Sequence, residues 1–288
     1  MSTAFELIAA DVKIWIKHPE YQYDVGDIEG GTFTFTGSSS SESEIDFWRR
    51  FFDDKRWATD MLDARICVDI TGMMRSHIMV LPMMFHTHGI RQVDFIYSDP
   101  VAYSSGIDTT FTRGAVEHVS QVPGYEGQHN TAPNTKDILI IGAGYDDRLI
   151  RAAAQARASA DQYVLMALPS LQPHMYQESQ VRLQKASESI HNYRNRSFLY
   201  APASNPFMTA QVLSDHVKMV RGNDSDSNVY LSPVGVKTQV LGFAWFFLCE
   251  CRDSATSIIF PYAPTYERET SRGIARLHIF RLELDFIV

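Results

Sequence analysis

Apolar runs of strand length alternate along this chain with longer runs that have helical periodicity. Five strand-like runs each end in a short polar loop that leads into a helix-like run, and the loops lie at residues 69–72, 142–148, 169–173, 202–206 and 232–238. Strand, loop and helix repeated in this order predict a parallel sheet with helices on its faces. The expected fold class is therefore α/β: a mainly parallel, Rossmann-like sheet with helices on both faces.

The pattern is clearest between residues 137 and 260. Strands are expected at 137–141, 163–168, 198–200, 228–231 and 256–260, with helices between them at 147–159, 176–193, 208–220 and 239–251. Upstream, strands at 66–70 and 93–97 flank a helix at 75–87, in which Pro82 should introduce a kink. All five loops should then collect at the carboxyl edge of one sheet, where ligands of such folds bind.

Residues 276–284 alternate apolar and polar residues, as a half-buried strand does, and predict a final edge strand. A further edge strand is expected at residues 115–122, inside the long connection 98–136. A connection of this length in a compact domain is often a lid or a binding loop.

The N-terminal region has a different pattern from the rest of the chain. Residues 10–16 and 32–36 alternate like strands, and residues 44–60 carry aromatic side chains at helical spacing. We expect residues 1–60 to form a small β-element with an aromatic-rich helix, packed on an α/β domain at 61–288.

Composition narrows the classes of partner. The 288 residues are 45% hydrophobic, which is ample for a large core, and 34 acidic residues outnumber 26 basic ones. An acidic balance argues against binding extended nucleic acid, although it allows a local basic pocket. No apolar run approaches the ~20 residues of a membrane span, and the first residues lack a signal-peptide pattern. With three cysteines and no disulfide framework, we expect a cytoplasmic protein without membrane contact.

The first loop places an acid at the end of a strand that is expected to be buried. Asp69 can bind a ribose hydroxyl, hold a metal or act as a base, while Thr71 and Gly72 can contact the same ligand. The alternative is structural: Asp69 caps the following helix and Arg75 neutralises it.

The loop after the 137–141 strand contains Gly142 and Gly144. Glycines at this point let backbone N–H groups approach an anion at a helix N-terminus. However, Asp147 occupies the third glycine position of the dinucleotide fingerprint. Asp146 is predicted as a ligand contact, with an ordinary helix N-cap as the alternative.

Three further strand ends add polar groups. Lys237 and Thr238 follow the 228–231 strand, but the spacing of a Walker A loop is absent. Lys237 can place its positive charge next to a phosphate or carboxylate group of a ligand. A solvated surface lysine is the alternative. Asp99 and Asn205 each precede a proline, which is also a common way to form a turn.

The long connection contains Glu126 in a glycine-bracketed segment, 122–127. Glu126 is a candidate acid or base on a lid, or part of a plain surface turn. The spacings of His86 and His88, and of Cys249 and Cys251, do not predict a metal site, and no nucleophile motif is present. The sequence does not define a cofactor.

Segments 66–75, 96–103, 122–127, 139–148 and 232–242 resemble a family of uncharacterised bacterial Rossmann-like α/β proteins associated with anti-phage gene clusters. The resemblance covers much of residues 65–273. It implies the α/β fold and a role in antiviral defence, and it supplies no catalytic residue.

The leading hypothesis is binding of a small phosphorylated or nucleotide-like ligand at the carboxyl edge of the sheet. If the protein is catalytic, hydrolysis or group transfer is expected, with Asp69 or Glu126 as acid or base and Lys237 balancing charge. The Asp146–Asp147 pair leaves recruitment of a divalent cation open. The alternative is a non-catalytic sensor or assembly subunit that binds a protein partner through the aromatic segment 47–57.

Overall fold

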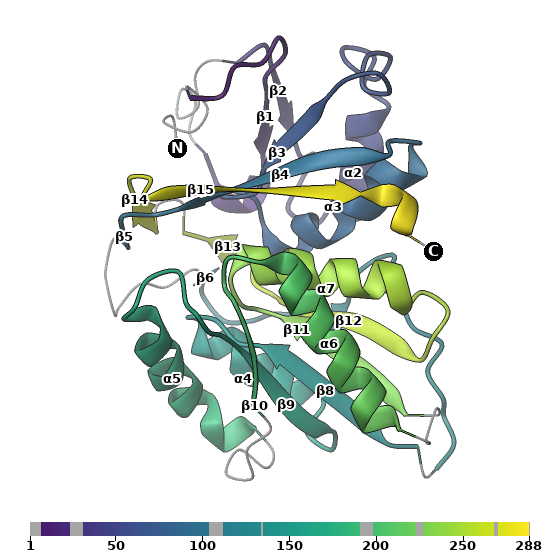
Figure 1. Cartoon of the computed structure of the whole chain (residues 1–288), viewed down its shortest axis with the longest axis vertical. Helices are drawn as coiled ribbons and strands as arrows, with labels where there is room; N and C mark the ends of the chain where they lie inside the picture. The colour runs from purple at the N-terminus through teal and green to yellow at the C-terminus, as the bar shows by residue number, and fades with distance from the viewer. Residues whose placement is uncertain are drawn as a thin grey trace.

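The computed structural model describes residues 7–23, 31–103, 112–133, 135–190, 198–222, 227–267 and 270–287. Two sheets dominate it, one in the upper and one in the lower half of Figure 1. No helix in these ranges is long and apolar enough to cross a membrane.

The larger sheet has six strands in the order β10-β9-β8-β11-β12-β7. Its members are β7 (His118–Gln121), β8 (Asp137–Gly142), β9 (Asp161–Ala167), β10 (Phe198–Ala201), β11 (Asn228–Pro233) and β12 (Thr256–Tyr262). Five strands are parallel, whereas β7 is an antiparallel edge strand, so the sheet is mixed. The strand order reverses between β8 and β11, because the chain moves outward to β10 and then returns to the other side of β8.

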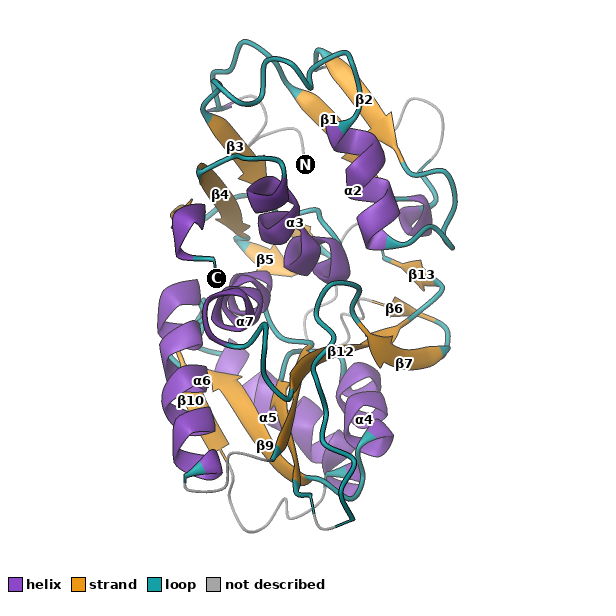
Figure 2. Ribbon diagram, turned by 90° about the vertical axis from the view of Figure 1, so that its right-hand side faces the viewer, coloured by secondary structure: helices purple, strands orange, loops and turns teal. Residues whose placement is uncertain are grey.

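Helices cover both faces of this sheet (Figure 2). Helices α4 (Asp147–Ala156) and α5 (Met175–Ala186) lie on one face, and α6 (Pro206–Arg221) and α7 (Lys237–Glu250) on the other. Helix α7 is buried over most of its circumference, as expected for a helix that is apolar all round.

The smaller sheet contains β3 (Ile66–Asp69), β4 (Gln92–Asp99) and β15 (Arg276–Glu283) in the order β15-β4-β3. Strand β3 is parallel to β4, and β15 is antiparallel to it, with residues 276–283 pairing with 99–92. The prediction of a C-terminal edge strand is confirmed. The prediction that all five loops follow strands of one sheet is wrong for residues 69–72, because β3 and β4 belong to this separate sheet.

The N-terminal elements pack on the smaller sheet through α3 (Arg75–Thr87). Strands β1 (Ile14–Lys17) and β2 (Phe33–Thr36) pair in parallel, and α2 (Glu44–Phe52) packs against α3. Phe47, Trp48 and Trp57 are at most 3% exposed. The aromatic segment 47–57 is therefore core, and the hypothesis that it forms a docking surface is wrong.

Short elements complete the described chain: η1 (Pro19–Tyr21), η3 (Ser187–Ser189), η5 (Leu284–Phe286), β5 (Ala102–Tyr103) paired with β14 (Ser271–Arg272), and β6 (Thr112–Arg113) paired with β13 (Thr265–Tyr266).

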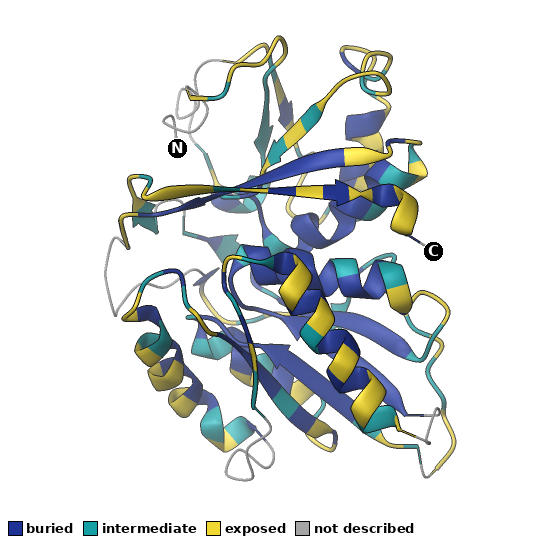
Figure 3. Ribbon diagram, viewed as in Figure 1, coloured by how far each residue is buried: buried dark blue, intermediate teal, exposed yellow. Residues whose placement is uncertain are grey.

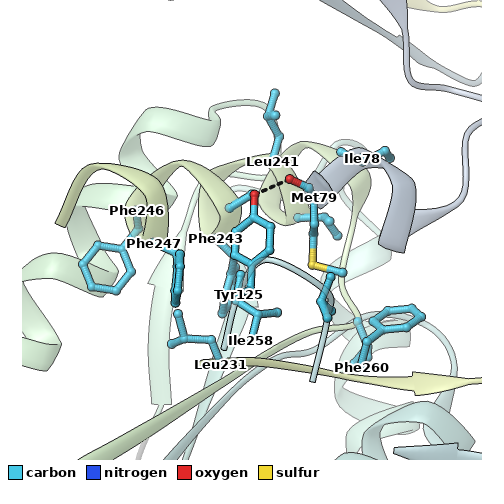
Figure 4. Packing of buried hydrophobic residues seen from close by; sticks show 14 of the residues in the cluster. Ile78, Met79, Tyr125, Leu231, Leu241, Phe243, Phe246, Phe247, Ile258 and Phe260 are labelled. Carbon is cyan, nitrogen blue, oxygen red and sulfur yellow. Dashed lines mark hydrogen bonds between the residues drawn. The ribbon is translucent and has the colours of Figure 1, made fainter. Parts of the chain in front are cut away.

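Helices α3 and α7 join the two sheets through one continuous hydrophobic core (Figure 4). Tyr125, which is fully buried, donates a hydrogen bond from its hydroxyl to the carbonyl of Met79 in α3. Its ring packs against Phe247 of α7, with 4.8 Å between ring centroids. Figure 3 shows this buried layer between the two sheets.

Candidate functional site

The loops that follow strands of both sheets meet at one junction. Thr71, which follows β3, is contacted from two directions: its hydroxyl accepts a hydrogen bond from the backbone N–H of Ser98 in β4 (2.8 Å), and its carbonyl accepts one from the Lys237 ammonium. The Arg75 Nε atom donates to the carbonyl of Gly235 (2.8 Å). The loops after β3 and β11 are thus in direct contact, although these strands belong to different sheets, and the β3 loop also contacts the end of β4.

Two helices begin at this junction with a cation. Helix α3 begins at Arg75 and α7 at Lys237, and the N-cap residues Met74 and Val236 make no side-chain capping hydrogen bond. Neither helix has an acidic residue in its first turn. The helix dipole favours negative charge at an N-terminus, so placing cations there is unfavourable unless an anion lies between them. This arrangement suits the binding of an anion.

The Lys237 ammonium lies in a region of low polarity. Burial, and to a smaller extent repulsion from Arg75, lowers its pKa to about 7, while the nearby Asp69 opposes this shift. Lys237 keeps partial solvent exposure, and in the described ranges its ammonium forms no ion pair with a carboxylate. Within the described ranges the Lys237 ammonium is therefore not paired with an acid, and the nearby Asp69 offsets only part of the effect of burial.

Two buried histidines, His18 and His77, lie beside this lysine. Their ring centroids are 4.3 Å apart, and both ring nitrogens of His18 and Nδ1 of His77 lack a hydrogen-bond partner within the described residues. Burial lowers the pKa of His77 to about 3, and burial together with His77 and Lys237 lowers that of His18. Burial thus disfavours the charged form of both imidazoles.

Asp69 is exposed rather than buried, because β3 is an edge strand with alternate residues exposed. Its carboxylate accepts a hydrogen bond from the N–H of Thr71 (2.8 Å) and so fixes the turn. The expectation of a buried acid at this strand end is wrong. Thr71 and Gly72 are half-buried at the junction, as a ligand contact requires.

Gly142 and Gly144 allow one loop of the larger sheet to pack on another. The carbonyl of Gly142 accepts a hydrogen bond from the N–H of Val234 (3.1 Å), and a Cβ atom on Gly144 would lie 2.6 Å from the carbonyl oxygen of Val234. Protein therefore fills the crevice where the strand order reverses. These glycines serve chain packing rather than the approach of an anion.

Three other predicted contacts have structural partners. Asp146 caps α4 by accepting from the N–H of Arg148 (3.2 Å), and it also accepts from the Thr112 hydroxyl (2.6 Å). Asn205 caps α6, and the Thr238 hydroxyl donates to the carbonyl of Ala203. Helix capping accounts for the positions of Asp146 and Asn205, and a contact between α7 and the loop after β10 accounts for that of Thr238. Asp99, the last residue of β4, lies at the junction.

Glu126 is separated from the junction. It is exposed, accepts from the N–H of Gly124 (2.8 Å), and lines a 430 Å³ hollow together with Phe247 and Arg252. Phe247 is ten residues after Lys237 in α7, which corresponds to about 15 Å along the helix. The structure thus does not bring Glu126 together with Lys237, and a shared acid–base role is not supported.

A second hollow, of 730 Å³, lies between β7 and α4 and contains Arg148, Arg151 and Arg157. Arg148 binds Asp146 and Thr112, and Arg151 pairs with Asp147. The Arg157 guanidinium lies 4.1 Å from the Tyr230 ring centroid. Arg148 and Arg151 are paired with carboxylates, whereas Lys237 donates to a neutral carbonyl, so the junction is the better candidate for an anion site.

Sequence reasoning selected Thr71 and Lys237, which lie at this junction, but it did not select His18 and His77, and it assigned Arg75 only to Asp69. Arg75 carried a usable signal, since it opens a helix that has no acid in its first turn. His18 precedes η1 and carries no comparable signal.

In the described ranges, no group of three or more His, Cys, Asp or Glu residues is placed to hold a metal ion. Comparison of the chain with protein-family models, with curated proteins and with solved structures found no match in any of the three.

Proposed function

We propose that this chain binds a small phosphorylated or nucleotide-like ligand at the junction between its two sheets. The observation that carries the proposal is the pair of uncapped helix N-termini that open with Arg75 and Lys237. A phosphate group would accept hydrogen bonds from both cations. Its negative charge would also offset the unfavourable position of a cation at the positive end of each helix dipole.

The topology supports the same location. Numbered from β8, the five parallel strands follow the order 3-2-1-4-5, which is the order of a Rossmann-like sheet. Ligands of such sheets lie outside the carboxyl ends of the strands. The loops of β8 and β11 pack on each other, and the β11 loop also contacts Arg75, so the candidate location is the side of this edge that faces the smaller sheet.

Binding without turnover is the function that this geometry favours. Glu126 is remote, and the Asp69 carboxylate holds the Thr71 turn, so neither expected acid–base group is directed at Lys237. A ligand-binding module, such as a sensor that responds to a phosphorylated metabolite, fits the arrangement better than a hydrolase.

Calorimetric titration with inorganic pyrophosphate and with ATP at pH 7 tests the proposal. Lys237→Met and Arg75→Met should each weaken binding at least about tenfold, because each removes a charge-assisted hydrogen bond. Lys136→Met is the matched control, since Lys136 is exposed just before β8, at the opposite edge of the sheet. Equal affinity in all four proteins, or no binding to the unmodified chain, would overturn the proposal.

A further inference from the structure

A buried carboxylate stands at the same junction without a complete set of partners. Asp99 is the last residue of β4 and is 1% exposed, and its Oδ1 atom has no hydrogen-bond partner within the described part of the chain. A carboxylate oxygen that loses water and gains no donor is energetically unfavourable. The Oδ1 atom of Asp99 therefore needs a hydrogen-bond donor.

Neighbouring residues within the described ranges do not supply this donor. Arg276 lies opposite Asp99 on β15, but it acts on the carboxylate only at a distance, as His278 also does. Burial is the largest influence and raises the pKa of Asp99. Across the junction, Asp99 is close enough to Tyr145, in the loop after β8, to help raise the pKa of that phenol.

Asp99 and the two cations are connected through Thr71. Ser98, the preceding residue, donates to the Thr71 hydroxyl, and Lys237 donates to the Thr71 carbonyl. Asp99 thus follows a residue that binds Thr71, and Lys237 binds Thr71 through a different atom. Asp99 and Lys237 do not form an ion pair with each other within the described ranges, so a molecule that contacts both groups has to span the Thr71 turn.

We propose that Asp99 accepts a hydrogen bond from a hydroxyl group of the ligand whose phosphate binds Lys237 and Arg75. The ligand class is then a phosphorylated sugar or a nucleotide with a free ribose hydroxyl, rather than inorganic phosphate or a phosphorylated acid. This inference rests on the function proposed above and narrows it.

Adenosine 5′-monophosphate, its 2′,3′-dideoxy analogue and inorganic pyrophosphate are the probes for the test. The unmodified chain should bind the monophosphate about tenfold more tightly than the dideoxy analogue, because a lost hydrogen bond to a charged group weakens binding by about this factor. Asp99→Asn should remove that difference and leave pyrophosphate affinity unchanged, which also shows that the variant is folded. Asp161→Asn is the matched control, because Asp161 is exposed at the start of β9.

The outcomes separate the two proposals. Equal affinity of the unmodified chain for the two nucleotides, or a difference that persists in Asp99→Asn, overturns the hydroxyl contact while leaving the anion site in place. Failure of every probe to bind the unmodified chain overturns both proposals.

Discussion

At the residue scale, Lys237 links the proposed site to the stability of the protein. A lysine whose pKa is lower in the folded than in the unfolded state binds fewer protons when folded, so its charge opposes folding as pH falls. The pKa of Lys237 falls from its usual value of 10.5 to about 7, and each unit of such a shift corresponds to about 1.4 kcal/mol.

We therefore expect Lys237→Met to be more stable than the unmodified chain at pH 6.5, by at least about 1 kcal/mol. The advantage should shrink as pH rises through the interval between about 7 and 10.5, where the lysine deprotonates in the unfolded state as well. Urea unfolding at several pH values measures this. A difference that does not vary with pH, or one also seen in Lys136→Met, would show that burial of the ammonium is not the cause.

Single residues of the site differed in how far the sequence revealed them. Lys237 and Thr71 could be predicted because each follows a strand, and strand ends locate the carboxyl edge. Asn205 was also found this way, but its side chain caps α6. Sequence position alone does not distinguish a cap from a ligand contact, because both need a polar side chain at the same place.

At the element scale, periodicity predicted most helices and strands of the described chain, with α3 matching the expected range 75–87. The sequence did not predict which strands belong to which of the two sheets. Strand β4 is buried along most of its length, as β8 is, and nothing local to β4 shows that its antiparallel partner is β15. Pairing is a long-range property, whereas periodicity reports only local burial.

The contact between α3 and the loop after β7 gives an element-scale prediction. Tyr125→Phe removes the hydrogen bond to the Met79 carbonyl but keeps the ring against Phe247. We expect the free energy of unfolding to fall by about 0.5–1.5 kcal/mol with an unchanged denaturant dependence. Chemical denaturation measures both quantities.

Tyr176→Phe is the control for this change, because the Tyr176 hydroxyl hydrogen-bonds only the exposed side chain of Gln180 in the described structure. It should alter stability by less than about 0.5 kcal/mol. An equal loss in the two variants would contradict a special role for the α3 contact.

At the scale of the whole molecule, one carboxylate connects distant parts of the chain. Asp94 of β4 binds Arg65 (2.9 Å), just before β3, and Arg281 (2.8 Å) of β15. The hydrogen bond to Arg281, and then that to Arg65, lowers the pKa of Asp94 against the effect of burial. All three strands of the smaller sheet are thereby joined through one side chain.

We expect Asp94→Asn to reduce the free energy of unfolding by about 1–3 kcal/mol at pH 7, because the arginines lose a charged partner. A carboxylate whose pKa is lowered by folding adds stability above its usual pKa of about 3.9 and loses it as pH falls further. The two proteins should therefore converge below pH 4. Asp46→Asn, which removes an exposed pair with Arg49, is the control for surface charge.

The late position of β15 has a consequence for biosynthesis. Asp94 and Arg281 are 187 residues apart, so one edge of β4 has no partner until the segment up to Arg281 has also left the ribosome. At about 5–20 residues per second, that interval lasts about 10–40 s. During it, an apolar strand with an unpaired edge is open to association with other nascent chains, so yield in the cell should depend on chaperone supply more than the stability of the finished protein suggests.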